Sequence, residues 1–416
     1  RDSWSYNSSA KVISNNFEKC ITFYNEQVTE AQRLGEDFQR SEDKTKIKWD
    51  RPQIRQVTKG KIYPDMCPKF IVPSLYRPFT RQFLYNDKSW ISCSYQMPSL
   101  FPFTGAQNVA IGIAGVGSSI FSCLMSNSIA CLDCLEKSQW LPRYLYRPVG
   151  ETAKGTKATE AKTTGQADLF AGSDAAELDA SNRQTGDQVV INGYVCEDAI
   201  KPEAVAHFRS AYAGHESEID ADSVFYYIYG ILHSKDYRAT YANNLQKELP
   251  RIPRVATFED FKAFEQAGRA LADLHVNYEQ VEPYDGCKVD GLEAGADATD
   301  LRVTKLKYGK IAGKKGNAAL DKTKIVYNDQ ITISGIPLEV QDYVVNKKSA
   351  LDWVVERCGV SIDKASQIVN DFNNMAEEMG DPQYILHLIL RVITVSLETN
   401  KIVASLPALR IHPLDQ

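Results

Sequence analysis

The sequence lacks the short motifs that carry catalysis in several large enzyme classes. It has no GxxxxGK[ST] phosphate loop, no HExxH zinc motif and no GxSxG nucleophile elbow. It also contains no Pro-Pro pair, which excludes the D/N/S-P-P-aromatic motif that an amino-methyltransferase needs to hold a flipped base. The six histidines are dispersed, and no Ser/His/Asp or Cys/His set can be nominated from spacing. We therefore predict no catalytic residue in this chain.

Cysteine and histidine are too scattered to build a metal site. The nine cysteines lie mostly within apolar patterns, which is typical of reduced thiols in a cytosolic protein rather than of a disulfide framework. Cys131 and Cys134 form one CxxC, but a structural zinc needs four ligands, and no second CxxC or HxxxH pair exists. We expect two core thiols there and no metal. His275 and His387 lie on apolar faces, so we expect hydrogen-bonded core histidines.

Long apolar runs are also missing. No stretch of about 18 apolar residues occurs, so no membrane span is expected. No signal peptide is visible, and the first residue is Arg1 rather than Met, which favours a fragment or a processed product. The 416 residues are 43% hydrophobic and 24% charged, which is enough for a sizeable core and for two or three domains.

A glycine-rich stretch at 108–121, NVAIGIAGVGSSIF, raises the question of a cofactor loop. Gly115 and Gly117 match the first two positions of the dinucleotide motif G-x-G-x-x-G, but Ile120 occupies the third. A methyltransferase loop is less strict, and Asp133 follows at a tolerable distance as a ribose partner. Because short glycine motifs match by chance, we favour a strand that ends in a tight turn. A fragment of an S-adenosylmethionine-dependent methyltransferase is kept as an alternative.

The periodicity of the apolar residues predicts an α+β fold that starts with a helix and a β-rich region. Spacings of three and four predict a helix over 8–34, capped by Asn7 or Ser8. Short apolar runs broken by Pro and Gly predict mixed or antiparallel strands up to residue 149. Residues 150–187 are small and polar, as in a flexible linker or mobile insertion. The first expected lobe is therefore 1–149.

The second expected lobe, 188–416, is mainly helical. Thr257 and Asp260 form a plausible capping box at the start of one of its helices. Alternating residues at 300–335 predict a small antiparallel sheet or hairpin. Residues 338–406 are predicted to be helical again. A central buried helix is expected near the end, because one segment is apolar on most sides: YILHLILRVITVSLETNKIV.

The net charge of −5 argues against a nucleic-acid binder, but the distribution of charge argues for one. Seven basic residues and one acid lie between Lys44 and Lys61, a net charge of +6. Eight basic residues and one acid lie between Arg302 and Lys324, a net charge of +7. Subtracting both segments from the total leaves −18 on the rest of the chain. Charge runs often only face solvent, but two basic segments on an acidic body can form a footprint for a polyanion.

Each basic segment suggests a way to contact DNA. Lys44, Lys46 and Lys48 alternate as they would along one face of a short strand, which would space the cations by about 6–7 Å, close to the phosphate repeat or its double. The second segment flanks a probable hairpin with the tip IAGKKGN, and a basic β-ribbon can enter the major groove. Two arginines in YRPFTR suit phosphate or guanine edges. We expect these groups to border one concave positive surface; the candidate DNA-binding residues are Lys44, Lys46, Lys48, Arg51, Arg55, Lys59, Lys61, Arg77, Arg81, Arg302, Lys305, Lys307, Lys310, Lys314 and Lys315.

Longer stretches of the chain resemble one known family. They are RDSWSYN, YRPFTRQFLYND, YQMPSLFP, FYYIYGILHSKDYRATYANNLQKELPRIP, AGRALADLHVNYE, YNDQITISGIP and SALDWVVERCGVSIDKASQIVND. They resemble the C-terminal region of type ISP restriction–modification enzymes. In that family one polypeptide joins a nuclease, a translocating helicase-like ATPase, a coupler, an adenine-N6 methyltransferase and a target-recognition domain. The resemblance extends over nearly the whole chain outside 150–187 and implies the target-recognition domain.

The resemblance implies a bacterial, cytoplasmic chain that recognises a short asymmetric site in double-stranded DNA without catalysing a reaction. Its other partners would be the methyltransferase and coupler domains of the same polypeptide. S-adenosylmethionine, ATP and Mg would be bound by those other domains, so no cofactor is expected in this chain. The lobe 1–149 would be the DNA-recognition lobe, and the aromatic and aliphatic motifs would shape the scaffold. A docking module that does not contact DNA is a further alternative.

Overall fold

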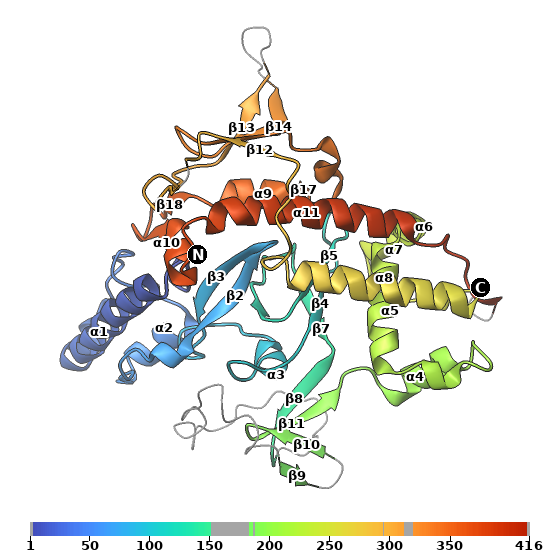
Figure 1. The fold of residues 1–416 in the computed structure, drawn as a ribbon. Coiled ribbons are helices and arrows are strands. Elements are labelled where there is room, and N and C mark those ends of the chain that lie inside the picture. The colour runs from blue at the N-terminus through green and yellow to red at the C-terminus, as the bar shows by residue number, and fades with distance from the viewer. Residues whose placement is uncertain (1–2, 151–182, 186–187, 294, 312–318, 414–416) are drawn as a thin grey trace.

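Figure 1 shows the computed structural model, which has the α+β architecture that the sequence predicts. Most of the expected insertion at 150–187 lies outside the described residues. In the described part of the chain, no helix is both long and apolar enough to cross a membrane. The structure describes residues 3–150, 183–185, 188–293, 295–311 and 319–413.

The long helix α1 (Ala10–Leu34) is the leading helix that the sequence predicts. Its buried side chains recur three or four residues apart and form one apolar stripe. The predicted cap is wrong, however, because the cap is Ser9, whose Oγ accepts a hydrogen bond from Val12 N at 3.3 Å. Asn7 instead accepts from Ser9 N at 3.1 Å, and Ser8 is fully buried, so neither side chain reaches the free amides of the first turn.

Small sheets make up the β-rich region that follows. Their strands pair antiparallel, except that β2 and β6 are parallel. The first sheet has the order β1 (Tyr6–Asn7), β3 (Thr80–Tyr85), β2 (Ile71–Arg77) and β6 (Ile129–Ala130). The second has the order β5 (Cys123–Ser126), β4 (Ala110–Ile113) and β7 (Gln139–Pro142). The third has the order β8 (Tyr144–Pro148), β11 (Tyr194–Asp198), β10 (Gln188–Ile191) and β9 (Arg183–Thr185).

The glycine-rich stretch forms a strand and a tight turn, as the sequence analysis favours. All four residues of β4 are buried, and the strand is antiparallel to both neighbours. Gly117 adopts a φ of 76° in the turn after it, and the chain then returns as β5 instead of entering a helix. A dinucleotide loop joins a strand to a helix within a parallel sheet. This stretch therefore lacks the strand-to-helix geometry of a dinucleotide-binding loop.

Helices dominate the chain after the third sheet. The helices α5 (Ala221–His233) and α8 (Phe258–Val276) pack closely because each contributes a glycine, Gly230 and Gly268, at the crossing. Thr257 caps α8, since its Oγ1 accepts from Asp260 N at 3.2 Å, as the predicted capping box requires. The shorter helices of this part are α4 (Pro202–Arg209), α6 (Lys235–Thr240) and α7 (Ala242–Leu245).

A four-stranded antiparallel sheet confirms the strands expected at 300–335. Its order is β12 (Lys288–Asp290), β15 (Thr332–Ser334), β14 (Leu320–Val326) and β13 (Lys307–Lys310). The expected central helix is α11 (Tyr384–Ser405), which crosses the molecule below this sheet and next to α8 (Figure 1). The remaining elements are the one-turn helix α3 (Met97–Leu100), β16 (Val344–Val345), β17 (Lys348–Ser349), α9 (Ala350–Arg357), α10 (Asn373–Met379) and the 3-10 helices η1 (Gly35–Asp37), η2 (Pro68–Phe70), η3 (Glu216–Glu218) and η4 (Leu338–Asp342).

The prediction that 338–406 is helical is wrong at the short β16–β17 pair and again after α9. There the antiparallel strands β18 (Val360–Ile362) and β19 (Val369–Asp371) form a two-stranded ribbon. Its loop is closed by Asp363, whose carboxylate accepts hydrogen bonds from Ser366 N and Oγ at 2.8 and 2.7 Å. Asp and Ser compete with helix formation through such local bonds.

One hydrophobic cluster links parts that are far apart in the sequence. It contains Leu75 of β2, Leu84 of β3, Ile333 of β15 and Ile389 of α11, all buried. The first sheet therefore packs against the same core as the C-terminal sheet and helix. The expected lobes, 1–149 and 188–416, stay a prediction.

Candidate nucleic-acid interface

The first basic segment does not form the strands that the sequence predicts. Residues 44–50 form a turn and a loop, because Asp43 Oδ1 accepts hydrogen bonds from Thr45 N and Oγ1 at 2.9 and 2.6 Å. These bonds lower the pKa of Asp43. Lys46 Nζ lies 5.2 Å from the centre of the Phe23 ring, and Lys48 pairs with Asp50 at 3.3 Å. The predicted row of three lysines on one strand face is therefore wrong.

A cationic row does exist, but it lies on the helix α2 (Arg51–Val57) and the turn after it. Arg51, Arg55 and Lys59 are exposed and four residues apart, whereas Gln53 and Val57 face the core. Residues at that spacing lie on one side of a helix. Within the described residues, no carboxylate lies within 4.0 Å of these three cations. We call Arg51, Arg55 and Lys59 the α2 row. Lys44 and Lys61 are exposed beside it.

The second basic segment lies on the C-terminal sheet. Lys305, Lys307 and Lys310 are exposed on and just before β13, and we call them the hairpin row. Arg302 is exposed as well but forms an ion pair with Asp371 of β19 at 2.5 Å. The predicted contacts Lys314 and Lys315 lie outside the described residues, as does the hairpin tip.

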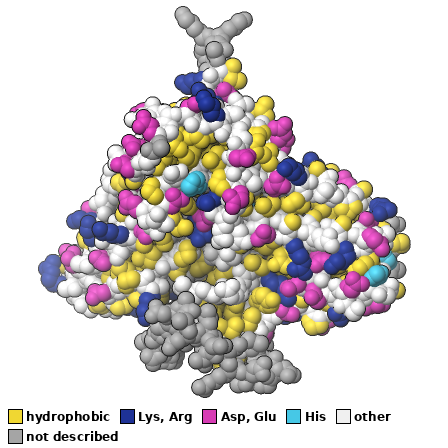
Figure 2. Space-filling view, viewed as in Figure 1, with side chains coloured by type: hydrophobic (Ala, Val, Ile, Leu, Met, Phe, Trp, Pro, Cys, Tyr) yellow, Lys and Arg dark blue, Asp and Glu magenta, His cyan; other side chains and the backbone are white. Residues whose placement is uncertain are grey.

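The two rows lie on either side of the β18–β19 ribbon. Ile47 and Ile368 are buried in the same cluster, which joins the first segment to one side of the ribbon. The ion pair of Arg302 joins the second segment to β19. Figure 2 accordingly shows Lys and Arg side chains near the hairpin and at the left edge, with acidic and neutral side chains between them. The cations therefore form two patches, not the single positive surface that we expect from the sequence.

A cavity of about 400 Å³ lies between α1, the turn at Thr45 and the ribbon. Polar side chains from all three elements line it, namely Asn16, Lys19, Thr45, Gln367, Asp371 and Asn374. Sequence reasoning missed the ribbon residues because it assigned them to a scaffold helix. The alternation of Val360, Ser361 and Ile362 before a polar loop is the strand signal that could have found them.

The two predicted arginines of the β2–β3 hairpin have different surroundings. Arg77 is 9% exposed, and its Nη1 donates to Tyr76 O at 2.7 Å and lies 3.2 Å from Cys131 Sγ. Its guanidinium also covers the Tyr76 ring at 4.1 Å. Arg77 is therefore enclosed by its own fold, and we leave it out of the interface.

Arg81 is partly exposed and pairs with Glu279 at 2.8 Å. Burial alone would lower its pKa, but Tyr278 and Glu279 beside it raise the pKa overall, so the guanidinium stays charged. It lines a large cleft that also contains Asn86 and Asn127. A cation in a cleft wall can meet a phosphate, although Arg81 would share its charge with Glu279.

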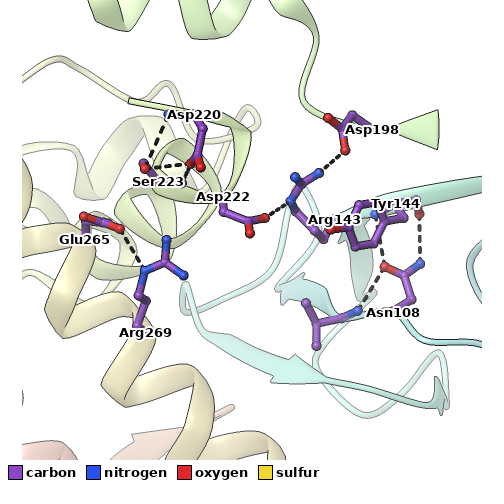
Figure 3. A network of polar contacts seen from close by, with 10 residues as sticks. Asn108, Arg143, Tyr144, Asp198, Asp220, Asp222, Ser223, Glu265 and Arg269 are labelled. Atoms are coloured by element: carbon purple, nitrogen blue, oxygen red, sulfur yellow. Dashed lines mark hydrogen bonds and ion pairs between the residues drawn. The ribbon is translucent and has the colours of Figure 1, made fainter. Parts of the chain in front are cut away.

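A polar network holds the β-rich region against the helices (Figure 3). Arg143 is 8% exposed at its side chain, pairs with Asp198 at 2.6 Å and also bonds Asp222 in the first turn of α5. Its guanidinium lies 4.3 Å from the centre of the Tyr144 ring. Asn108 donates to Tyr144 O at 2.8 Å and accepts from Tyr144 N at 3.0 Å. The buried charge of Arg143 is therefore paired, which is how a scaffold can include it.

The histidines and the CxxC pair that the sequence analysis names differ in burial. His275 is buried, with Nδ1 2.6 Å from Tyr229 Oη and Nε2 3.0 Å from Thr399 Oγ1, which confirms the expected core histidine. His387 is half-buried and lies 3.1 Å from Asp381 Oδ2. Cys131 and Cys134 are buried next to β6 and form no disulfide, and burial raises the pKa of the Cys134 thiol. Within the described residues, no group of three or more potential metal ligands occurs.

Comparisons with known proteins add to this geometry. A family model described as "Type ISP C-terminal specificity domain" matches residues 1–388. A nuclease-deletion mutant of the Type ISP restriction–modification enzyme LlaGI, in complex with a DNA substrate mimic, is similar with a TM-score of 0.75 and 28% identity. The match covers 99% of this chain and 32% of that one. A search of curated proteins found no match.

Two further DNA-bound structures are similar over 99% of this chain. One is the ATP-dependent Type ISP restriction–modification enzyme LlaBIII bound to DNA, with a TM-score of 0.75, 27% identity and 23% of that chain covered. The other is the DrdV–DNA complex, with a TM-score of 0.74, 28% identity and 35% of that chain covered. The chain therefore spans between 23% and 35% of the length of these structures.

Proposed function

Because this chain belongs to the family of Type ISP C-terminal specificity domains, we propose that it recognises the target site in double-stranded DNA for a larger restriction–modification enzyme. The single observation that carries the proposal is the match over 99% of the chain to enzymes whose structures contain DNA. At 27–28% identity the likeness extends to sequence as well as to fold. The site recognised would be short and asymmetric.

The α2 row and the hairpin row would hold the phosphates. Lysine and arginine contacts of this kind give affinity, register and salt dependence but carry no sequence information. Polar side chains between the two rows, such as Asn16, Gln367 and Asn374 beside the 400 Å³ cavity, can instead form hydrogen bonds with base edges. Two cationic patches with uncharged polar groups between them suit a duplex that contacts both patches.

The chemistry of the enzyme would belong to other domains of the polypeptide. We propose that this chain is not catalytic, that S-adenosylmethionine, ATP and Mg bind elsewhere, and that the methyltransferase and coupler domains are its protein partners in the bacterial cytoplasm. The burial of His275, Cys131 and Cys134 supports this division, since general bases and nucleophiles must reach a substrate.

Selection from a randomised pool tests the proposal. The full chain is incubated with duplexes that carry a random central segment, and the bound fraction is amplified and sequenced over several rounds. Enrichment of one short asymmetric motif is expected. If the bound pool keeps its random composition, the chain binds DNA without sequence preference and target recognition is contradicted. If no DNA is bound at all, DNA binding by this chain is contradicted as well.

A further inference from the structure

A cleft of about 820 Å³ lies between the first sheet and the loop after α3. Its walls come from β2, the turn at 86–89, residues 98–108 and the ends of β8 and β11. Cavities of about 300–1,000 Å³ hold molecules of drug size, which is the scale of a mononucleotide or dinucleotide and far below that of a duplex. The cleft adjoins α2, because Gln53 Nε2 donates to Ser89 O at 2.5 Å. The cleft therefore borders the same short helix that carries the α2 row.

One wall of the cleft is aromatic. The ring of Phe103 lies 5.8 Å, between centroids, from the rings of both Tyr146 and Tyr194. Tyr146 is buried, and its hydroxyl donates to Gln107 O at 2.8 Å, so this side chain supports the wall. Phe103 and Tyr194 are half-buried and line the open space. Nucleobases stack on aromatic faces of this kind regardless of base identity.

Two carboxamides also line the cleft. Asn86 and Asn127 line it, and neither side chain has a hydrogen-bond partner within the described residues. Asn108 is a useful contrast, because it donates to Leu100 O and Tyr144 O and accepts from Val109 N, and so serves the fold. A carboxamide that is not used by the protein can pair with the donor and acceptor groups of a base edge.

The charge of the lining suits a phosphate backbone. Lys69, Arg81 and Lys88 are the cations among the described lining residues, against one carboxylate, Asp87. Asp87 is engaged by its own turn, since its Oδ1 accepts from Ser89 N at 2.7 Å. Lys88 is exposed beside the cleft, where an ammonium can neutralise a phosphate.

We propose that this cleft binds unpaired nucleotides of DNA. A base would stack on Phe103 and Tyr194, Asn86 and Asn127 would bond its edge, and Lys88 would contact the adjacent phosphate. The inference rests on the proposed function, since the α2 row would present the strand to the cleft. Bases in a duplex have no access to such a site, because their faces are stacked and their edges are paired.

Fluorescence anisotropy of two labelled probes, each titrated with the full chain, tests the inference. One probe is a short oligothymidine strand, and the other is a duplex of the same length. Replacing both stacking residues, Phe103→Ala with Tyr194→Ala, is expected to weaken single-strand binding about tenfold and to leave duplex binding unchanged. Tyr95→Ala is the matched control, because Tyr95 is 69% exposed and does not line the cleft.

A second variant covers the case in which the aromatic pair is needed for folding. Asn86→Ala with Asn127→Ala removes side chains that form no internal hydrogen bond and should weaken single-strand binding at least about fivefold. Single-strand affinity that is unchanged in this variant, or absent in the unmodified chain while the duplex still binds, overturns the cleft inference alone. Single-strand binding that depends on these residues, with no duplex binding, supports the cleft and counts against the proposed function.

Discussion

At the residue scale, burial determines the protonation of His275. The imidazole lies among Tyr229, Thr399 and the parallel ring of Tyr343, whose centroid is 5.3 Å away. Burial, and after it the charge of Arg238, lowers the pKa of His275 from 6.5 to about 3. The neutral ring is therefore the folded form at every pH near neutrality.

This shift predicts a loss of stability in mild acid. Below pH 6.5 the unfolded chain binds a proton at His275 and the folded chain does not. The contribution of the neutral His275 ring to the free energy of unfolding is therefore complete above pH 6.5 and declines toward pH 3. Each pH unit in that window costs up to about 1.4 kcal/mol for one such histidine. Chemical denaturation at pH 7.5, 6 and 5 measures it, and His275→Gln should show a shallower decline. A free energy of unfolding that is flat over this range would refute the assignment.

At the element scale, the crossing of α5 and α8 depends on two glycines. A Cβ on Gly268 would lie 1.8 Å from Tyr226 O, and a Cβ on Gly230 would lie 2.1 Å from Phe264 O. Both neighbours are backbone atoms, so neither can rotate away. The two helices can approach this closely only where a side chain is missing.

The substitution Gly268→Ala should therefore destabilise the fold although Ala is the better helix former. The helices must separate, and overpacking of this kind costs about 1–3 kcal/mol. Gln266→Ala, on the exposed side of α8, is the control and should change stability by less than about 0.5 kcal/mol. Thermal unfolding of both variants measures the difference, and equal melting temperatures would show that the crossing is not as tight as described.

The α2 row makes a prediction about salt. The triple change Arg51→Gln, Arg55→Gln and Lys59→Gln should weaken duplex binding and reduce the slope of log K against log salt by about 2–3, since each phosphate contact contributes about 0.9. The control neutralises Lys235, Lys247 and Arg251, exposed cations near α6 and α7 on the other side of the molecule (Figure 1). If both triple variants change the slope equally, binding is only a response to net charge.

At the scale of the whole molecule, the separation of the two cationic patches has a measurable consequence. The ribbon lies between the α2 row and the hairpin row, and the rows share no partner among the described residues. Contributions from such distant sites usually add within about 0.3–0.5 kcal/mol. Both patches should nevertheless contact one duplex.

We therefore expect additive losses when both patches are neutralised. A hairpin-row variant, with Lys305, Lys307 and Lys310 each changed to Gln, should weaken duplex binding on its own. Combining it with the α2-row variant should lose the sum of the two binding free energies within about 0.5 kcal/mol. Titration of one labelled duplex with the four proteins completes the cycle. A hairpin-row variant that binds as tightly as the unmodified chain would remove that patch from the interface.

The local pattern of residues in the sequence determined several secondary-structure elements of this protein. The apolar spacing predicts α1, α8 and α11, and the glycines predict the turn after β4. These signals are local, because helix periodicity and turn conformation depend on residues that are near in sequence. The family resemblance, carried by long motifs, extends the same information to function.

Tertiary structure decided where the charges lie and which of them are available. Arg77 looks like a DNA contact in the sequence, but Tyr76 and Cys131, one of them 54 residues away, enclose it. The row of lysines expected on a strand is replaced by the α2 row because a turn closed by Asp43 and a buried Ile47 determine the course of the loop. The cleft beside α2 is lined by several segments that are far apart in the sequence. Burial and ion pairing depend on partners distant in sequence, so only the folded chain could reveal them.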